Sequence, residues 1–156
     1  GDSSVLSVGA GRNYRLLQFH FHHPSEHLID GKSFPMEVHF VHANAAGSLA
    51  VVGVLMTTGR PNAVFNKIVS TMPEQEGPAV KADPAINPNG LLPAARSYYR
   101  YSGSLTTPPC SECVTWGVLD NPTDLSMAQV DRFGKIYSGN ARPVQPLNGR
   151  TFSWPT

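Results

Sequence analysis

Short runs in which apolar and polar residues alternate dominate the chain, with glycine and proline between them. An alternation of period two places every second side chain on the same face of a strand. The pattern predicts five strands, at residues 14–22, 36–43, 49–57, 98–102 and 113–120. It predicts two short helices, at 61–71 and 126–137, with Ser126 as the N-cap and Gly139 terminating the second. We therefore expect a mainly β fold with a minor helical part.

The proline-rich segment 73–93 is expected to be a loop ordered by packing, with little regular structure. No repeat or shift in composition divides the chain, so we expect one domain over residues 1–156. A content of 40% hydrophobic and 15% charged residues fits a globular protein. The longest apolar run, at 49–56, is far shorter than the ~20 residues of a spanning helix, so no membrane span is expected.

The charge balance bears on the partners. Twelve basic and eleven acidic side chains nearly cancel, and neither sign forms a run. Recognition of nucleic acid relies on a basic patch, so we expect no nucleic-acid partner. A small neutral substrate is compatible with this balance.

Three histidines on two predicted strands form the main candidate site. In QFHFHH, strand alternation puts Gln18, His20 and His22 on one face, and in MEVHFV it groups Glu37 with His39. Three imidazoles with an open fourth position are a ligand set of catalytic zinc. Gln18 and Glu37 can accept the other ring N–H groups and so orient the ligands. The sequence therefore predicts Zn²⁺ bound by His20, His22 and His39.

Other interpretations of the histidines remain open at this point. The three can be the polar face of ordinary amphipathic strands. HFHHPSE also matches the HxHxxxE core of a cupin, which would bind iron or manganese, although the glycine spacing around it and the early position of His39 do not fit. His23 and His42 have the opposite parity and His27 follows an acidic residue, so these three are interpreted as structural.

The spacing of Cys110 and Cys113 is that of a CxxC motif. Such a motif serves redox chemistry or zinc binding when it begins a helix after a strand, or when a second CxxC is present. Neither context is visible here. Ordinary packing, or a disulfide with a residue outside this chain, is the simpler interpretation.

Five blocks of the sequence resemble the signature blocks of the alpha-class carbonic anhydrases and occur in the same order. The resemblance runs from about residue 5 to the end. The zinc block and SLTTPP are the most specific of the five, which read QFHFHHPSEHLIDGK, PMEVHFVHAN, LAVVGVL, YRYSGSLTTPPCSECVTW and NARPVQPLNGR. The resemblance implies a large twisted, mostly antiparallel sheet with a few short peripheral helices, in a domain that is N-terminally incomplete. It also implies the same three zinc ligands.

The resemblance implies reversible hydration of CO₂ to bicarbonate and a proton through zinc-bound hydroxide. Thr106 would orient the hydroxide, and Glu26 would hold Thr106, because an ionised carboxylate only accepts and so claims the single proton of the threonine hydroxyl. CO₂ is apolar, so its pocket should be hydrophobic, and bound anions would include sulfonamides. The matching pocket positions are Val41, Val51, Leu105, Thr107, Val114 and Trp116.

The resemblance also implies a segment upstream of Gly1 that carries the histidine proton shuttle and a cysteine partner for Cys110. A carbonic-anhydrase-like binding module without efficient catalysis is therefore an alternative. The match to bacterial-type members favours a secreted or periplasmic enzyme. A homodimer stays open, as do the source and the physiological role.

Overall fold

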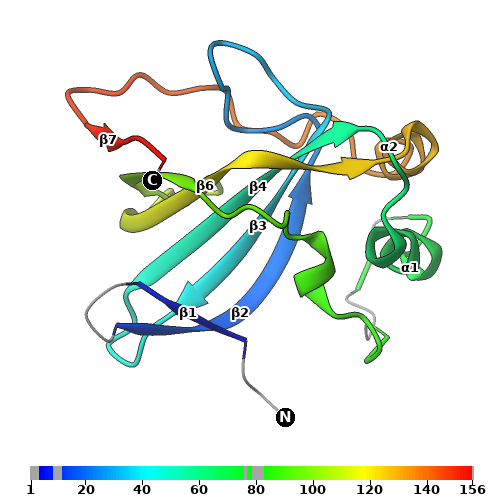
Figure 1. Cartoon of the computed structure of the whole chain (residues 1–156), viewed down its shortest axis with the longest axis horizontal. Helices are drawn as coiled ribbons and strands as arrows, with labels where there is room; N and C mark the ends of the chain where they lie inside the picture. Colours follow the sequence, from blue (N-terminus) through cyan, green and yellow to red (C-terminus); the bar gives the residue numbers. More distant parts are fainter. Residues whose placement is uncertain (1–3, 9–11, 76, 79–82, 156) are drawn as a thin grey trace.

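A seven-stranded sheet forms the centre of the molecule (Figure 1). The computed structural model describes residues 4–8, 12–75, 77–78 and 83–155. The strands are β1 (Val5–Ser7), β2 (Asn13–His22), β3 (Met36–Ala43), β4 (Leu49–Thr58), β5 (Tyr98–Ser104), β6 (Glu112–Leu125) and β7 (Phe152–Ser153). Their order across the sheet is β1-β2-β3-β4-β6-β5-β7. Only β4 and β6 pair in parallel, so the predicted mostly antiparallel sheet is confirmed.

All five predicted strands are present, and two of them extend more than one residue beyond their predicted ends. β6 continues to Leu125, and β5 continues to Ser104, which pairs with Glu112 across a register shift. The sequence analysis missed β1 and β7, which have three and two residues. Strands this short carry no detectable alternation and are defined only by their neighbours in the sheet.

Two helices flank the sheet, α1 (Ala63–Thr71) and α2 (Met127–Gly134). Ser126 caps α2 as predicted, in a capping box with Gln129. The predicted C-terminal end of this helix was wrong, because α2 ends at Gly134 and Gly139 lies in the following loop. Within segment 73–93, the described residues contain one regular element, the 3-10 helix η1 (Pro88–Leu91).

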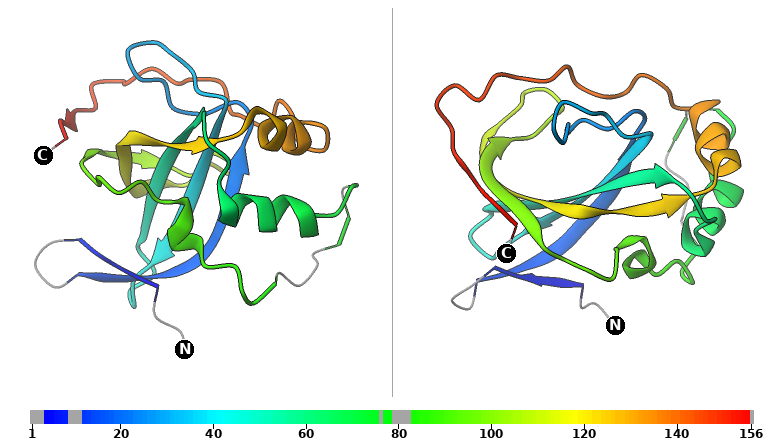
Figure 2. Two further views of the ribbon diagram at one scale, coloured as in Figure 1. Left: turned by 45° about the vertical axis from the view of Figure 1, so that its right-hand side comes forward. Right: turned by 45° about the horizontal axis from the view of Figure 1, so that its top comes forward.

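The two faces of the sheet have different roles. One face carries the larger core cluster, in which Met36, Val38 and Val54 pack with Phe65 of α1 and Phe133 of α2. The opposite face carries the odd-numbered residues of β3. The segment between α2 and β7 passes over that face, near the loop that follows β2 (Figure 2). No helix in the described part of the chain is both long and apolar enough to cross a bilayer.

Candidate metal centre

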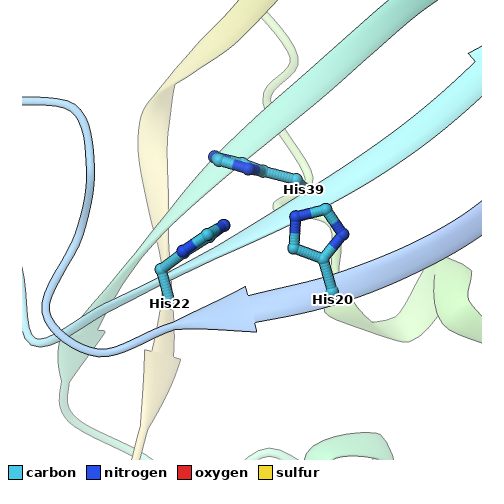
Figure 3. A group of neighbouring side chains, drawn as sticks. All are labelled: His20, His22 and His39. Atoms are coloured by element: carbon cyan, nitrogen blue, oxygen red, sulfur yellow. The ribbon is translucent and has the colours of Figure 1, made fainter. Parts of the chain in front are cut away.

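The antiparallel register of β2 and β3 brings three histidines together. His20 lies directly opposite His39, and His22 lies two residues further along β2. Their rings turn toward one common point (Figure 3), and one nitrogen of each lies within 4.8 Å of the others. Parity grouped the two histidines of β2, and the register of the two strands brings His39 to the same face.

Each of the three rings has its other nitrogen hydrogen-bonded. His20 Nδ1 lies 2.8 Å from Gln18 Oε1, His39 Nε2 lies 3.0 Å from Glu37 Oε1, and His22 Nδ1 lies 3.0 Å from the backbone oxygen of Asn140. The acceptors fix the N–H on the outer nitrogen of each ring. The inner nitrogens therefore present three lone pairs to one point, which is what a metal cation requires.

His22 provides the sharpest indication that a cation belongs here. Its Nε2 is buried and has no hydrogen-bond partner among the described residues. A buried polar atom without a partner is unfavourable unless something else satisfies it. Three neutral imidazole nitrogens are ligands that zinc prefers, so the donor set fits Zn²⁺.

Burial keeps His20 and His22 neutral at physiological pH. Burial is the main cause that lowers the pKa of His20 to about 4, and the neighbouring His39 and His22 lower it further. Burial also lowers the pKa of His22. A metal ligand must be the unprotonated imidazole, so both rings are ready to bind without first losing a proton.

Glu37 is the acceptor at the centre of a buried network. Its Oε1 accepts from His39 Nε2 and from His27 Nδ1 at 2.6 Å, and its Oε2 accepts from the backbone N–H groups of Glu26 and His27, each at 2.9 Å. Burial alone would raise its pKa, but His27 and His39 outweigh that effect and hold the pKa well below the usual range. Glu37 is therefore an ionised carboxylate with both oxygens satisfied.

His27 links Glu37 to Tyr101 on β5, whose hydroxyl lies 2.7 Å from His27 Nε2. Burial opposes protonation of His27, but the charge of Glu37 raises its pKa. His27, Glu37 and His39 also cluster closely enough to resemble a metal site. Because both rings donate to the same carboxylate oxygen, we interpret that cluster as a hydrogen-bond network.

Glu26 and Thr106 line one cavity of about 750 Å³. Glu26 Oε1 accepts from the backbone N–H of Arg142 at 2.7 Å. Its Oε2 is buried, has no hydrogen-bond partner among the residues that the structure describes, and lies 3.9 Å from His39 Nδ1. No hydrogen bond joins Glu26 and Thr106 in the described residues, so their pairing stays a prediction.

Four of the six predicted pocket residues lie in strands, on the histidine face of the sheet. Val41 pairs with Val51, which pairs with Trp116, and the Trp116 ring centroid is 4.8 Å from that of His39. These three residues and Val114 belong to one buried cluster, against which Leu105 packs. Thr107 is exposed. An apolar wall therefore adjoins the metal centre.

The remaining histidines and the cysteines lie outside the three-histidine group. His42 is buried on the opposite face of the sheet, where burial lowers its pKa. His23 follows the end of β2 and packs against Gly134. Cys110 and Cys113 are both free, so they form no disulfide with each other.

Comparison with known proteins identifies the family. The family model for eukaryotic-type carbonic anhydrase matches residues 2–154. The chain belongs to the carbonic anhydrase family. The carbonic anhydrase of Klebsiella pneumoniae is 50% identical to it over 141 residues, which are 90% of this chain and 57% of that protein. The cofactor of this chain is therefore Zn²⁺, in agreement with the three histidine nitrogens.

Solved carbonic anhydrases share the fold. The alpha-carbonic anhydrase of Photobacterium profundum is 46% identical, with a TM-score of 0.91 over 97% of this chain and 69% of that one. The enzyme of Thermovibrio ammonificans, solved with the inhibitor sulfanilamide, is 47% identical, with a TM-score of 0.87 over 92% and 64%. The chain spans little more than half the length of the curated bacterial relatives it matches. Membership in this family contradicts the cupin alternative.

Sequence reasoning missed three residues of this centre. Asn140 and Arg142 come from the segment after α2, more than 110 residues from the histidine and glutamate they contact. Tyr101 on β5 contacts His27, which lies in the loop between β2 and β3. Only the NARPVQPLNGR block pointed to the first two, without indicating what they touch.

Proposed function

We propose that this protein catalyses the reversible hydration of CO₂ to bicarbonate and a proton, with Zn²⁺ held by His20, His22 and His39. One observation carries the proposal. Three inward-facing imidazole nitrogens, each on a ring oriented by its own acceptor, lie beside an apolar wall.

The residues of the chain supply neutral ligands and hold them rigidly. Bound Zn²⁺ lowers the pKa of a coordinated water to about 7, a value established for carbonic anhydrases, and so supplies a nucleophile at neutral pH. Three uncharged ligands leave the positive charge of the cation undiminished. Hydrogen bonds to Gln18, Glu37 and the Asn140 carbonyl fix the orientations of the three rings, which keeps the three inner nitrogens directed at one point.

Glu26 and Thr106 are proposed to orient the nucleophile. Support comes from the buried Glu26 Oε2, which no donor in the described part of the chain satisfies. The Thr106 hydroxyl lines the same cavity and has one proton to donate. With that proton given to Glu26, the Thr106 oxygen can only accept, which selects one orientation of an incoming O–H.

The apolar wall is proposed to receive CO₂, an uncharged molecule that makes no demand for charged partners. Val41, Val51, Leu105, Val114 and Trp116 would form it, with Thr107 at its mouth. Because a related enzyme was solved with sulfanilamide, we also propose that sulfonamides bind this centre. A secreted or periplasmic location and a homodimer stay predictions.

The test measures CO₂ hydration by stopped-flow with a pH indicator, together with bound zinc. His39→Ala should abolish hydration and weaken zinc binding by more than about 100-fold, because loss of a ligand costs more than loss of the group that orients it. The matched control is His42→Ala, which removes a buried histidine from the same strand on the other face and should keep the zinc.

Two outcomes would contradict the proposal. Unchanged hydration in His39→Ala would exclude the ligand set. Wild-type protein that binds zinc and a sulfonamide but does not hydrate CO₂, even with added imidazole buffer, would show the alternative function, a binding module.

A further inference from the structure

Two consecutive residues after α2 hold the end of β2. Gly139 N–H donates to the backbone oxygen of His23 at 2.8 Å. Asn140 makes three further hydrogen bonds to Phe21, His22 and His23. Residues 139–140 therefore contact the three residues that include one of the proposed metal ligands.

The side-chain amide of Asn140 acts like a peptide group of a neighbouring strand. Its Oδ1 accepts from His23 N–H at 2.7 Å, and its Nδ2 donates to the Phe21 oxygen at 3.0 Å. Residues two apart in a strand direct their backbone groups to the same edge, so one amide can satisfy both. These partners require both a donor and an acceptor, which an amide supplies and a carboxylate does not.

Asn140 also contacts the ring of His22, the residue between Phe21 and His23. The backbone oxygen of Asn140 accepts from His22 Nδ1 at 3.0 Å, which fixes the N–H of His22 away from the site. If the two hydrogen bonds of the Asn140 side chain are lost, the end of β2 can separate from residues 139–140. The carbonyl would then no longer be fixed relative to the His22 ring.

We propose that the Asn140 side chain is a positioning residue for the metal centre, which slows release of the ion by fixing both the strand and the ring of His22. This inference rests on the proposed assignment of His22 as a ligand. It assigns a separate role to the exposed amide, beyond the backbone carbonyl that contacts the ring.

The experiment measures zinc transfer from the holoprotein to an excess of a chromophoric chelator. Asn140→Ala removes both hydrogen bonds of the side-chain amide. Asn140→Asp keeps the acceptor for His23 N–H but places a second acceptor oxygen against the Phe21 oxygen. Losing a group that orients a metal ligand typically costs about 10- to 100-fold in metal affinity. We expect that loss to appear in the release rate, so both variants should release zinc roughly 10- to 100-fold faster. The matched controls are Asn66→Ala and Asn66→Asp on the exposed side of α1, which should release zinc at the wild-type rate.

A second measurement separates positioning from general stabilisation. A ligand that binds only the folded protein raises Tm, and it raises Tm more when it binds more tightly. A purely structural role would lower Tm equally with and without zinc, and the difference between the two values would stay that of the wild type. If Asn140 positions the metal centre, the rise in Tm on zinc binding should be smaller in both Asn140 variants than in the wild type.

Release within twofold of the wild type in both Asn140 variants, or an unchanged Tm difference, would overturn the inference. A wild-type protein that binds no zinc would instead overturn the proposed function.

Discussion

Replacing Glu37 with glutamine should remove the acceptor at the centre of the site while keeping its shape. Each carboxylate oxygen accepts two N–H donors at 2.6–3.0 Å, and the side chain is fully buried. A glutamine has one acceptor and one NH₂. Whichever way it turns, two of the four donors lose their acceptor.

The magnitude follows from those two donors. A buried donor without a partner costs about 1–3 kcal/mol, and breaking a buried charged pair costs about 3–5 kcal/mol. We expect Glu37→Gln to lower the free energy of unfolding by about 3–5 kcal/mol. Urea denaturation of the metal-free protein at pH 7 measures this directly.

The matched control is Asp124→Asn, which makes the same chemical change at the surface. Asp124 Oδ2 lies 3.4 Å from Arg60 Nε, and the two side chains are 39% and 93% exposed. Exposed ion pairs contribute about 0–1 kcal/mol, so this variant should stay within about 1 kcal/mol of the wild type. A Glu37→Gln variant as stable as this control would refute the role given to the buried network.

Three further perturbations test neighbouring parts of the structure. Gly53→Ala should lower stability by about 1–3 kcal/mol and weaken zinc binding, as measured by denaturation and chelator titration, because its Cβ would lie 2.7 Å from Glu37 Oε1. The folded pKa of His20 is about 4 and its ordinary value 6.5, so the unfolded chain binds more protons between these pH values. The metal-free protein should therefore lose about 1–2 kcal/mol as pH falls from 6.5 to 4, after allowance for partial exposure, and a His20→Asn variant should lose less over that range. Ser126→Ala should cost about 0.5–2 kcal/mol by thermal denaturation and leave zinc binding unchanged, because Ser126 Oγ caps only α2.

The strands that carry the three histidines were predictable because one face of each is apolar. Around the histidines, alternation puts Phe19 and Phe21 on the face opposite His20 and His22, and Val38 and Phe40 on the face opposite His39. Parity then grouped His20 with His22, and it allowed His39 to join them from a paired strand. The structure agrees, with His20 directly opposite His39.

The bonds that orient those histidines were only partly predictable. Gln18 and Glu37 lie two residues from the histidines they contact, so strand parity was enough to find them. The Asn140 carbonyl reaches His22 from 118 residues away. Contacts of this kind depend on where a loop passes over the sheet, and no local periodicity in the sequence records that path.

This separation along the chain has a consequence for the order in which the protein assembles. The three proposed ligands lie on one hairpin, so closing the loop between them has a small entropic cost, whereas the Asn140 contact closes a loop of more than a hundred residues. During synthesis the hairpin emerges well before residue 140. The nascent chain would then present a complete ligand set before the segment that secures His22 exists, so an ion captured early would exchange freely until the last part of the chain docks.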